Sequence, residues 1–220
     1  MSRALTLLFG AIIGLSLGLV AKSLITKVDS ATQPSARILV RTSCIIGVIL
    51  SDLIFLRFSE IELQVCFTIL FFGLLVQSLI DAYTHRLVRQ ISQIMGVTGV
   101  LLLGFNAINN SNSNFLVSAA VCATLGVAIS FVSNKISGGS LGAGDVRLMA
   151  VLGWHLGFLG YSEAMWALFA ACGFAGVFGV AMIVLRGGSW QQRIAFGPFL
   201  ALGTLTAIFV NEVSSYTFVA

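Results

Sequence analysis

The sequence has very little charge for its length. Only 9% of its 220 residues are Asp, Glu, Lys or Arg, whereas about 25% is usual in soluble globular proteins. A soluble fold of this size needs a charged surface, and 12 basic and 8 acidic residues cannot provide one. Apolar residues make up 58% of the chain. The composition therefore excludes a soluble domain and predicts a membrane protein.

Patterns for binding metals or forming disulfides are also missing. The sequence has no C-x-x-C pair and no cluster that mixes cysteine with histidine. The four cysteines, each inside an apolar stretch, are Cys44, Cys66, Cys122 and Cys172. We therefore expect free buried thiols, with no zinc site and no disulfide framework. The net charge of +4 does not indicate a nucleic-acid partner, because the basic residues form no patch interleaved with aromatic ones.

Long apolar stretches recur along the chain. A helix that crosses a bilayer needs about 20 mostly apolar residues. The candidate stretches are 4–21, 38–56, 61–80, 91–108, 115–132, 146–160, 164–185 and 194–210. No segment between them is long enough to form a separate soluble domain. The sequence predicts an all-α, polytopic bundle of about eight transmembrane helices, in which residues 1–220 form a single domain embedded in the lipid bilayer.

The basic residues indicate an orientation. Cytoplasmic loops carry an excess of Lys and Arg. If the loop between the first two stretches is cytoplasmic, ten of the 12 basic residues lie on that side, and only Arg3 and Arg57 do not. Both termini are therefore expected outside the cytoplasm.

Glycines recur at spacings that suit helix packing in two of the stretches. They are Gly10, Gly14 and Gly18 in the first stretch, and Gly173, Gly176 and Gly179 in the seventh. Small residues at this spacing let two helix backbones approach closely. We expect both groups to pack against neighbouring helices and to have no function of their own.

Acidic residues at membrane depth are costly and are therefore candidates for function. Five of the eight acids lie in loops, at external helix ends or near the C-terminus, and we expect them to be solvated: Asp29, Glu60, Glu62, Glu163 and Glu212. Asp52 is expected to pair with Arg57. Asp81 and Asp145 remain, and both are predicted at the cytoplasmic membrane border.

Asp81 and Asp145 lie at opposite kinds of helix end. Asp81 ends the third stretch, where the helix dipole and the free carbonyls are negative. Asp145 opens the sixth, where a carboxylate can cap free backbone N–H groups, and by itself it could be a structural cap. Two carboxyls that share a proton are the working group of aspartic proteases. We predict that Asp81 holds this proton and that Asp145 activates water.

Glycines surround the second aspartate. Gly138, Gly139, Gly142 and Gly144 predict a flexible loop with little side-chain bulk, which a substrate backbone could approach closely. We expect Gly142 and Gly144 to contact substrate, whereas Arg147 is expected to anchor the loop at the membrane interface.

Three segments resemble those of a known family. Gly142-Ala143-Gly144-Asp145-Val146-Arg147-Leu148, with Gly153 and Gly157 after it, is similar to the GxGD segment of type IV prepilin peptidases. Ile80-Asp81, followed by basic residues, resembles their first catalytic aspartate, and Phe196-Gly197-Pro198 resembles a segment of their last helix. The family usually has a proline followed by Asn or Asp shortly after the first aspartate, whereas this chain has Leu87-Val88-Arg89.

The resemblance implies an intramembrane aspartic endopeptidase of the bacterial cytoplasmic membrane that uses no metal and no organic cofactor. Such an enzyme cuts the basic leader from type IV prepilins or type II secretion pseudopilins, and Asp81 and Asp145 would form its catalytic dyad. Some relatives also carry a methyltransferase domain with paired CxxC motifs between the first two helices. The short, cysteine-free first loop here implies a member with peptidase activity alone.

Two other classes of function are compatible with two aspartates in a membrane protein. An ion-coupled transporter could use them to bind a cation or relay protons. That class predicts more polar residues at mid-membrane depth and internal repeats, and the sequence shows neither. A non-catalytic assembly subunit would leave both carboxylates unexplained.

Overall fold

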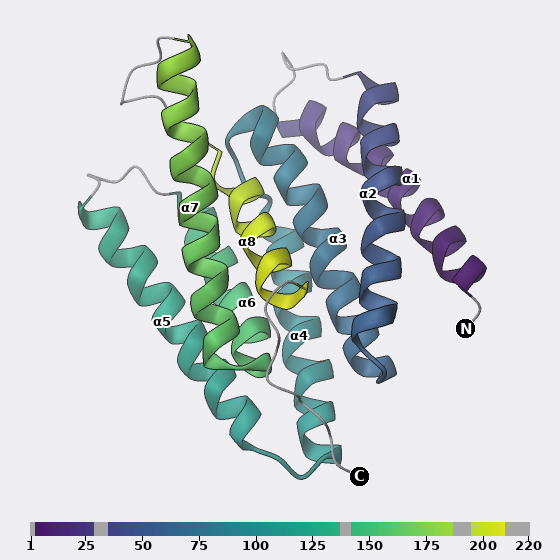
Figure 1. Ribbon diagram of the computed structural model, residues 1–220, viewed down its shortest axis with the longest axis vertical. Coiled ribbons are helices and arrows are strands. Elements are labelled where there is room, and N and C mark those ends of the chain that lie inside the picture. The colour runs from purple at the N-terminus through teal and green to yellow at the C-terminus, as the bar shows by residue number, and fades with distance from the viewer. Residues whose placement is uncertain (1–2, 29–34, 137–141, 187–194, 210–220) are drawn as a thin grey trace. The chain divides into compact units, whose positions relative to one another are not determined.

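A computed structural model describes residues 3–28, 35–136, 142–186 and 195–209. These residues form helices and no strands, which confirms the predicted all-α class. The helices are α1 (Arg3–Val28), α2 (Ala36–Arg57), α3 (Ile61–Thr84), α4 (Arg89–Asn109), α5 (Asn114–Ile136), α6 (Ala143–Leu159), α7 (Tyr161–Arg186) and α8 (Gly197–Phe209). Figure 1 labels them along the chain.

Six of the helices are long and apolar enough to cross a membrane. These are α1 to α5 and α7. The other two, α6 with 17 residues and α8 with 13 described residues, are shorter. At a rise of about 1.5 Å per residue, 13 residues span about 20 Å of a hydrocarbon layer that is about 30 Å thick. The molecule is a multi-pass membrane protein, and the predicted orientation of its termini stays a prediction.

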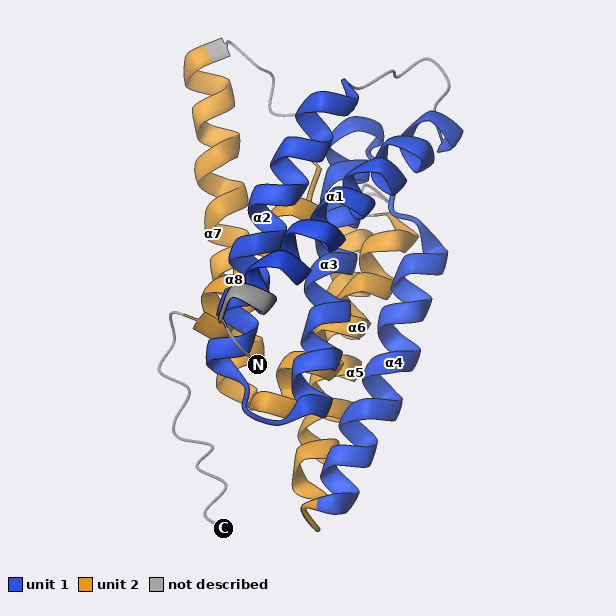
Figure 2. Ribbon diagram, turned by 90° about the vertical axis from the view of Figure 1, so that its right-hand side faces the viewer, with its two compact units in different colours: residues 1–109 blue, residues 110–220 orange. Residues whose placement is uncertain are grey.

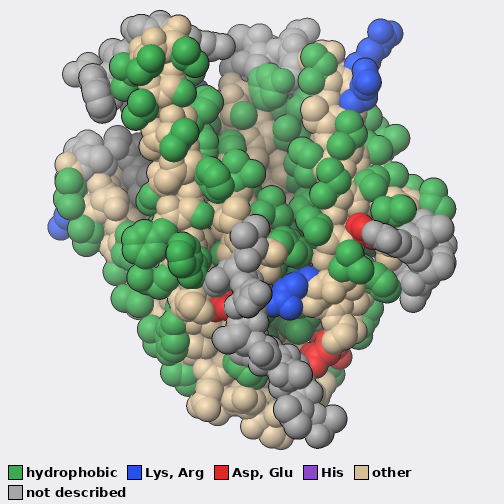
Figure 3. Space-filling view, in the orientation of Figure 1, with side chains coloured by type: hydrophobic (Ala, Val, Ile, Leu, Met, Phe, Trp, Pro, Cys, Tyr) green, Lys and Arg blue, Asp and Glu red, His purple; other side chains and the backbone are tan. Residues whose placement is uncertain are grey.

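The helix surfaces carry many exposed apolar side chains. Ile12 on α1 is 68% exposed and Val177 on α7 is 73% exposed. Figure 3 shows hydrophobic side chains over much of the visible face and few charged ones. Exposed apolar surface of this extent is unfavourable in water but is solvated by lipid chains, which agrees with the predicted bilayer environment.

The helices divide into two compact units, shown in different colours in Figure 2. The first unit, residues 1–109, contains α1 to α4, and in it α3 packs against each of the other three helices. The second unit, residues 110–220, contains α5 to α8, and its main pairs are α5 with α6 and α7 with α8. The prediction of a single domain over the whole chain stays a prediction.

Glycines bring α1 and α2 into backbone contact in the first unit. A Cβ atom added at Gly14 would lie 2.4 Å from the carbonyl oxygen of Ser43, and one at Gly10 would lie 2.6 Å from that of Gly47. One at Gly18 would lie 2.8 Å from the Cα of Val40. The predicted packing role of these three glycines is therefore confirmed.

The corresponding prediction for the seventh stretch is wrong at Gly173 and Gly176, and at Gly179 it stays a prediction. A Cβ atom added at Gly173 or Gly176 on α7 would meet nothing within 4 Å. The glycines that bring helices together in the second unit are on α5, α6 and α8. For example, a Cβ at Gly203 would lie 2.3 Å from the carbonyl oxygen of Ala167 on α7. The spacing of small residues marks a possible packing face, but it does not show which face meets a neighbour.

Candidate active site

Asp81 lies in the last turn of α3, as predicted, and its side chain is only 5% exposed. The residue that follows the helix, His85, adopts the left-handed conformation with φ 51° and donates its backbone N–H to the carbonyl oxygen of Asp81 at 2.8 Å. The preceding residue, Ile80, is fully buried in an apolar cluster with residues of α1 and α2. The backbone at Asp81 is therefore fixed by the burial of Ile80 before it and by the hydrogen bond from His85 after it.

A buried glutamine one helical turn before Asp81 holds the connection from α3 to α4. The Gln77 side chain accepts the backbone N–H of Val88 at 2.8 Å and donates to the carbonyl oxygen of Val88 at 3.1 Å. Its amide also donates to the hydroxyl of Ser92 on α4 at 2.8 Å. Both the donor and the acceptor side of the Gln77 amide are thus satisfied, and the loop after Asp81 is fixed to the helix that carries it.

This contact explains how the loop is shaped without the proline that is usual at this point in the resembled family. A proline at position 88 would lack the N–H group that Gln77 accepts. The role of Gln77 was not predicted from the sequence. The signal that could have found it is a polar amide inside the apolar α3, four residues before Asp81 and therefore on the same helix face.

We predict that Gln77→Leu lowers the thermal stability of the protein. The substitution removes three hydrogen bonds, and each buried polar group left unpaired costs about 1–3 kcal/mol. Gln90→Leu is the matched control, because Gln90 is exposed on the first turn of α4. The measurement is the unfolding midpoint in detergent. Equal midpoints for the two variants would show that the Gln77 contacts do not hold the loop.

Asp145 lies in the first turn of α6, three residues after the N-cap position. The helix begins at Ala143, with Gly142 as its N-cap, so Asp145 is the third helical residue. Its carboxylate accepts the backbone N–H of Gly142 at 3.1 Å, and its own N–H donates to the carbonyl oxygen of Gly142 at 3.0 Å. The carboxylate therefore does pair with a free backbone N–H at a helix start, as expected, but it does so from inside the helix.

Gly142 leaves room for this carboxylate. A Cβ atom at Gly142 would lie 3.3 Å from Oδ2 of Asp145, which is tighter than usual contact. The φ of Gly142 is −70°, so its backbone does not need the left-handed region. Gly144 is helical and half-buried, so the predicted flexible loop does not extend to it. Gly138 and Gly139 lie outside the described residues, and contacts of Gly142 and Gly144 with substrate stay a prediction.

The two aspartates lie in different units of the structure. Asp81 belongs to the first unit and Asp145 to the second, so the pairing of their carboxyls stays a prediction. What each unit supplies is one carboxyl at a fixed helix end. Asp81 is buried at the negative end of α3, and Asp145 is half-buried at the positive end of α6. A pair with these properties could divide the roles of acid and base.

The other acidic residues correct one expectation. Glu163, expected to be solvated, is only 1% exposed on α7, and it accepts the hydroxyl of Ser162 at 2.8 Å. Glu60 is half-buried and accepts the side-chain amide of Asn106. Asp29 and Glu212 lie outside the described residues. The pairing of Asp52 with Arg57 stays a prediction.

No group of three or more His, Cys, Asp or Glu side chains comes together within the described part of the chain. The expectation that no metal takes part therefore stays a prediction.

The sequence model of the type IV leader peptidase family matches residues 68–180, just over half of the chain. The chain belongs to this family. The matched segment runs from α3 to α7 and includes both Asp81 and Asp145. The resemblance stated from the sequence is thereby confirmed, although the Phe196-Gly197-Pro198 segment lies outside the match. The curated proteins and the solved structures give no match to this chain.

Membership of the leader peptidase family makes the chain a peptidase. Carboxyl groups are among the side chains that can supply the general acid and the general base for peptide hydrolysis.

Proposed function

We propose that this leader peptidase is an intramembrane aspartic endopeptidase whose dyad is Asp81 and Asp145. The observation that carries the proposal is that both carboxyls lie within the family match, each fixed at the end of a helix by the contacts described above. The N–H of Gly142 and the positive end of α6 stabilise negative charge on Asp145. In this proposal Asp81, which is buried at the negative end of α3, is the partner that holds the proton.

Hydrolysis then follows from these two states. The Asp145 carboxylate takes a proton from a water molecule, and the resulting hydroxide attacks the scissile carbonyl carbon. Asp81 donates its proton to the carbonyl oxygen as the tetrahedral intermediate forms. As that intermediate collapses and its C–N bond breaks, Asp145 gives the proton taken from water to the leaving amine, and one hydroxyl of the intermediate returns a proton to Asp81. The two carboxyls thus exchange their protonation states as the intermediate forms and regain them as it collapses, which is why both are needed.

The substrate in this proposal is a prepilin or pseudopilin with a basic leader followed by an apolar stem. Placing the basic loops of the enzyme in the cytoplasm puts Asp81 and Asp145 on the cytoplasmic side, where a basic leader is retained. The membrane is then the cytoplasmic membrane of a bacterium.

We also propose that the protein lacks methyltransferase activity. Only residues 29–35 separate α1 from α2, and this segment contains no cysteine. Seven residues cannot form a zinc-binding domain. The product would therefore leave with an unmodified N-terminal amine.

One experiment tests these proposals together. The purified protein is incubated in detergent with a prepilin-like substrate and S-adenosylmethionine, and the product is examined by mass spectrometry and N-terminal sequencing. We expect one cut between the leader and the stem and no added methyl group. An uncleaved substrate would contradict the peptidase proposal, and a methylated product would contradict the second proposal. Proton flux that depends on the aspartates, without cleavage, would favour the transporter hypothesis.

A further inference from the structure

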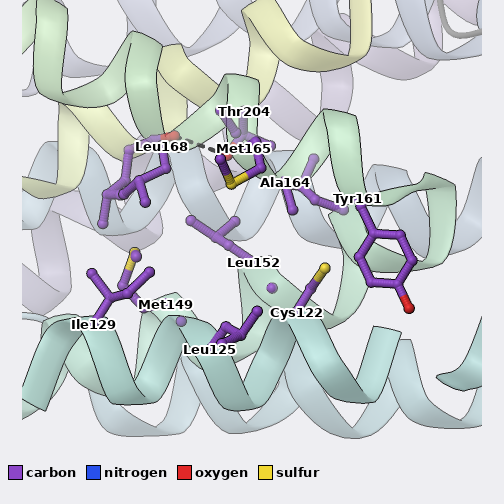
Figure 4. Close-up of a pocket in the computed structure, with 15 residues that line it drawn as sticks. Cys122, Leu125, Ile129, Met149, Leu152, Tyr161, Ala164, Met165, Leu168 and Thr204 are labelled. Carbon is purple, nitrogen blue, oxygen red and sulfur yellow. Dashed lines mark hydrogen bonds between the residues drawn. The ribbon is translucent and has the colours of Figure 1, made fainter. Parts of the chain in front are cut away.

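An apolar cavity of about 200 Å³ lies within the second unit, between α5, α6, α7 and α8. Residues of all four helices line it, as Figure 4 shows for ten of them. Leu125 and Ile129 of α5 lie on one side and Met165 and Leu168 of α7 on the other, with Leu152 of α6 between them. We call this cavity the α5–α7 groove. Its lining is almost entirely apolar, so it would not hold ordered water.

The exposure of its lining shows where the groove opens. Leu125 on α5 and Met165 on α7 are each 53% exposed, whereas Leu152 and Leu156 on α6 are 4% and 3% exposed. The rim is therefore formed by α5 and α7, and α6 forms part of the floor. An apolar segment of another membrane protein can enter an opening between two transmembrane helices sideways from the bilayer.

The residues of α6 that line the groove lie on the same helix face as Asp145. The α6 residues that line it are Met149, Leu152, Gly153 and Leu156. They follow Asp145 by 4, 7, 8 and 11 residues, which is the spacing of one helix face. With a rise of about 1.5 Å per residue, the lining begins about 6 Å from Asp145 and ends about 16 Å from it. The same face of α6 thus carries the carboxylate at its start and the groove along its length.

We propose that the α5–α7 groove binds the apolar stem of the substrate, on the C-terminal side of the scissile bond. The inference rests on the proposed function. A whole helix about 10 Å wide does not fit into the cavity, but the large side chains on one face of a helix do. With the scissile bond at Asp145, these side chains come from about the first three helical turns of the stem. A lipid chain would fill the same space but would have no reason to align with Asp145.

The first test fills the groove without removing a contact. Ala164 on α7 is half-buried and lines the groove, and Ala164→Phe adds a ring inside it. The matched control is Ala120→Phe, because Ala120 is exposed on α5 and does not line the groove. With a substrate that carries a full stem, we expect Ala164→Phe to raise KM about tenfold with kcat nearly unchanged. The control should match the wild type.

A substrate whose stem ends one turn after the scissile bond distinguishes binding in the groove from general damage. Wild type and Ala164→Phe should then have equal KM values, because this substrate does not reach the groove. An increase in KM that persists with the short substrate would overturn the assignment.

The second test leaves the groove unfilled, so it does not depend on whether the Ala164→Phe variant folds. A photoreactive benzophenone amino acid replaces Leu125 at the rim in one protein and Ala120 in another. On illumination with the full-stem substrate, we expect the first protein to form a cross-link to the stem and the second to form none. Cross-links from position 125 to lipid alone would overturn the proposal, even if KM changes.

The outcomes distinguish a failure of the groove assignment from a failure of the proposed function. If the wild type cleaves the substrate but neither the KM difference nor the cross-link is found, the groove assignment is wrong and the proposed function stands. If the wild type cleaves nothing, the proposed function is wrong and the assignment falls with it.

Discussion

Asp81→Asn and Asp145→Asn should each abolish leader cleavage. An asparagine keeps the shape of the side chain but can neither take a proton from water nor donate one to the scissile carbonyl. General acid or base catalysis contributes about 10²–10⁴-fold to a rate, and one turnover of a dyad uses both groups, so each single variant should lose at least this much. The measurement is the initial rate of leader release from a full-stem substrate in detergent.

Asp52→Asn is the matched control for these two variants. Asp52 is a half-buried acid on α2 and has no place in the proposed mechanism. We expect this control to cleave at the wild-type rate and all three variants to unfold at similar temperatures. Near wild-type turnover in either Asp81→Asn or Asp145→Asn would show that the mechanism does not use two aspartates.

Gly153→Ala, which adds a single methyl group, should destabilise the second unit and slow catalysis. A Cβ at this position would lie 2.5 Å from the carbonyl oxygen of Cys122 and 2.7 Å from the Cα of Ala123. Both are backbone atoms of α5, so neither can rotate away and the two helices must separate. Overpacking of this kind typically costs about 1–3 kcal/mol. Because α6 also carries Asp145, a shift of about 1 Å could lower kcat by about 10²-fold.

Gly173→Ala is the control for Gly153→Ala. Gly173 lies on α7 in the same unit, and a Cβ there would meet nothing within 4 Å. Alanine favours a helix over glycine by about 1 kcal/mol, so this variant should be as stable as the wild type or more so. Thermal unfolding and leader cleavage are measured on both variants. Equal behaviour would mean that α5 and α6 are not held in backbone contact at Gly153.

The sequence predicted which segments are helical more accurately than where they begin and end. The first stretch was expected to end at residue 21, but α1 continues to Val28 and includes Lys22 and Lys27. Hydropathy detects the apolar part of a helix, whereas the helix itself continues into polar residues that leave the hydrocarbon. In the same way, α6 begins at Ala143, before the apolar run, because its first turn is held by the contacts of Asp145 with Gly142.

For the candidate site, the sequence predicted the positions of the carboxyls but not the residues that hold them. The helix ends of Asp81 and Asp145 followed from where the apolar runs stop and start. The contacts of Gln77 with Val88 depend on how the loop folds back on α3, and no local pattern contains that information. Burial of Glu163 was missed for the same reason, since it depends on neighbours distant in sequence.

The central claim is that Asp81 and Asp145 meet, and chemical cross-linking tests it most directly. The four native cysteines are replaced, Asp81→Cys and Asp145→Cys are introduced, and a protease site is placed in the 110–113 segment between α4 and α5. After treatment with a short reagent that joins two thiols, the chain is cut and denatured. We expect the halves to stay joined for this pair and to separate for a control pair of Asp81→Cys with Ala120→Cys. Halves that separate in both proteins would contradict a shared dyad.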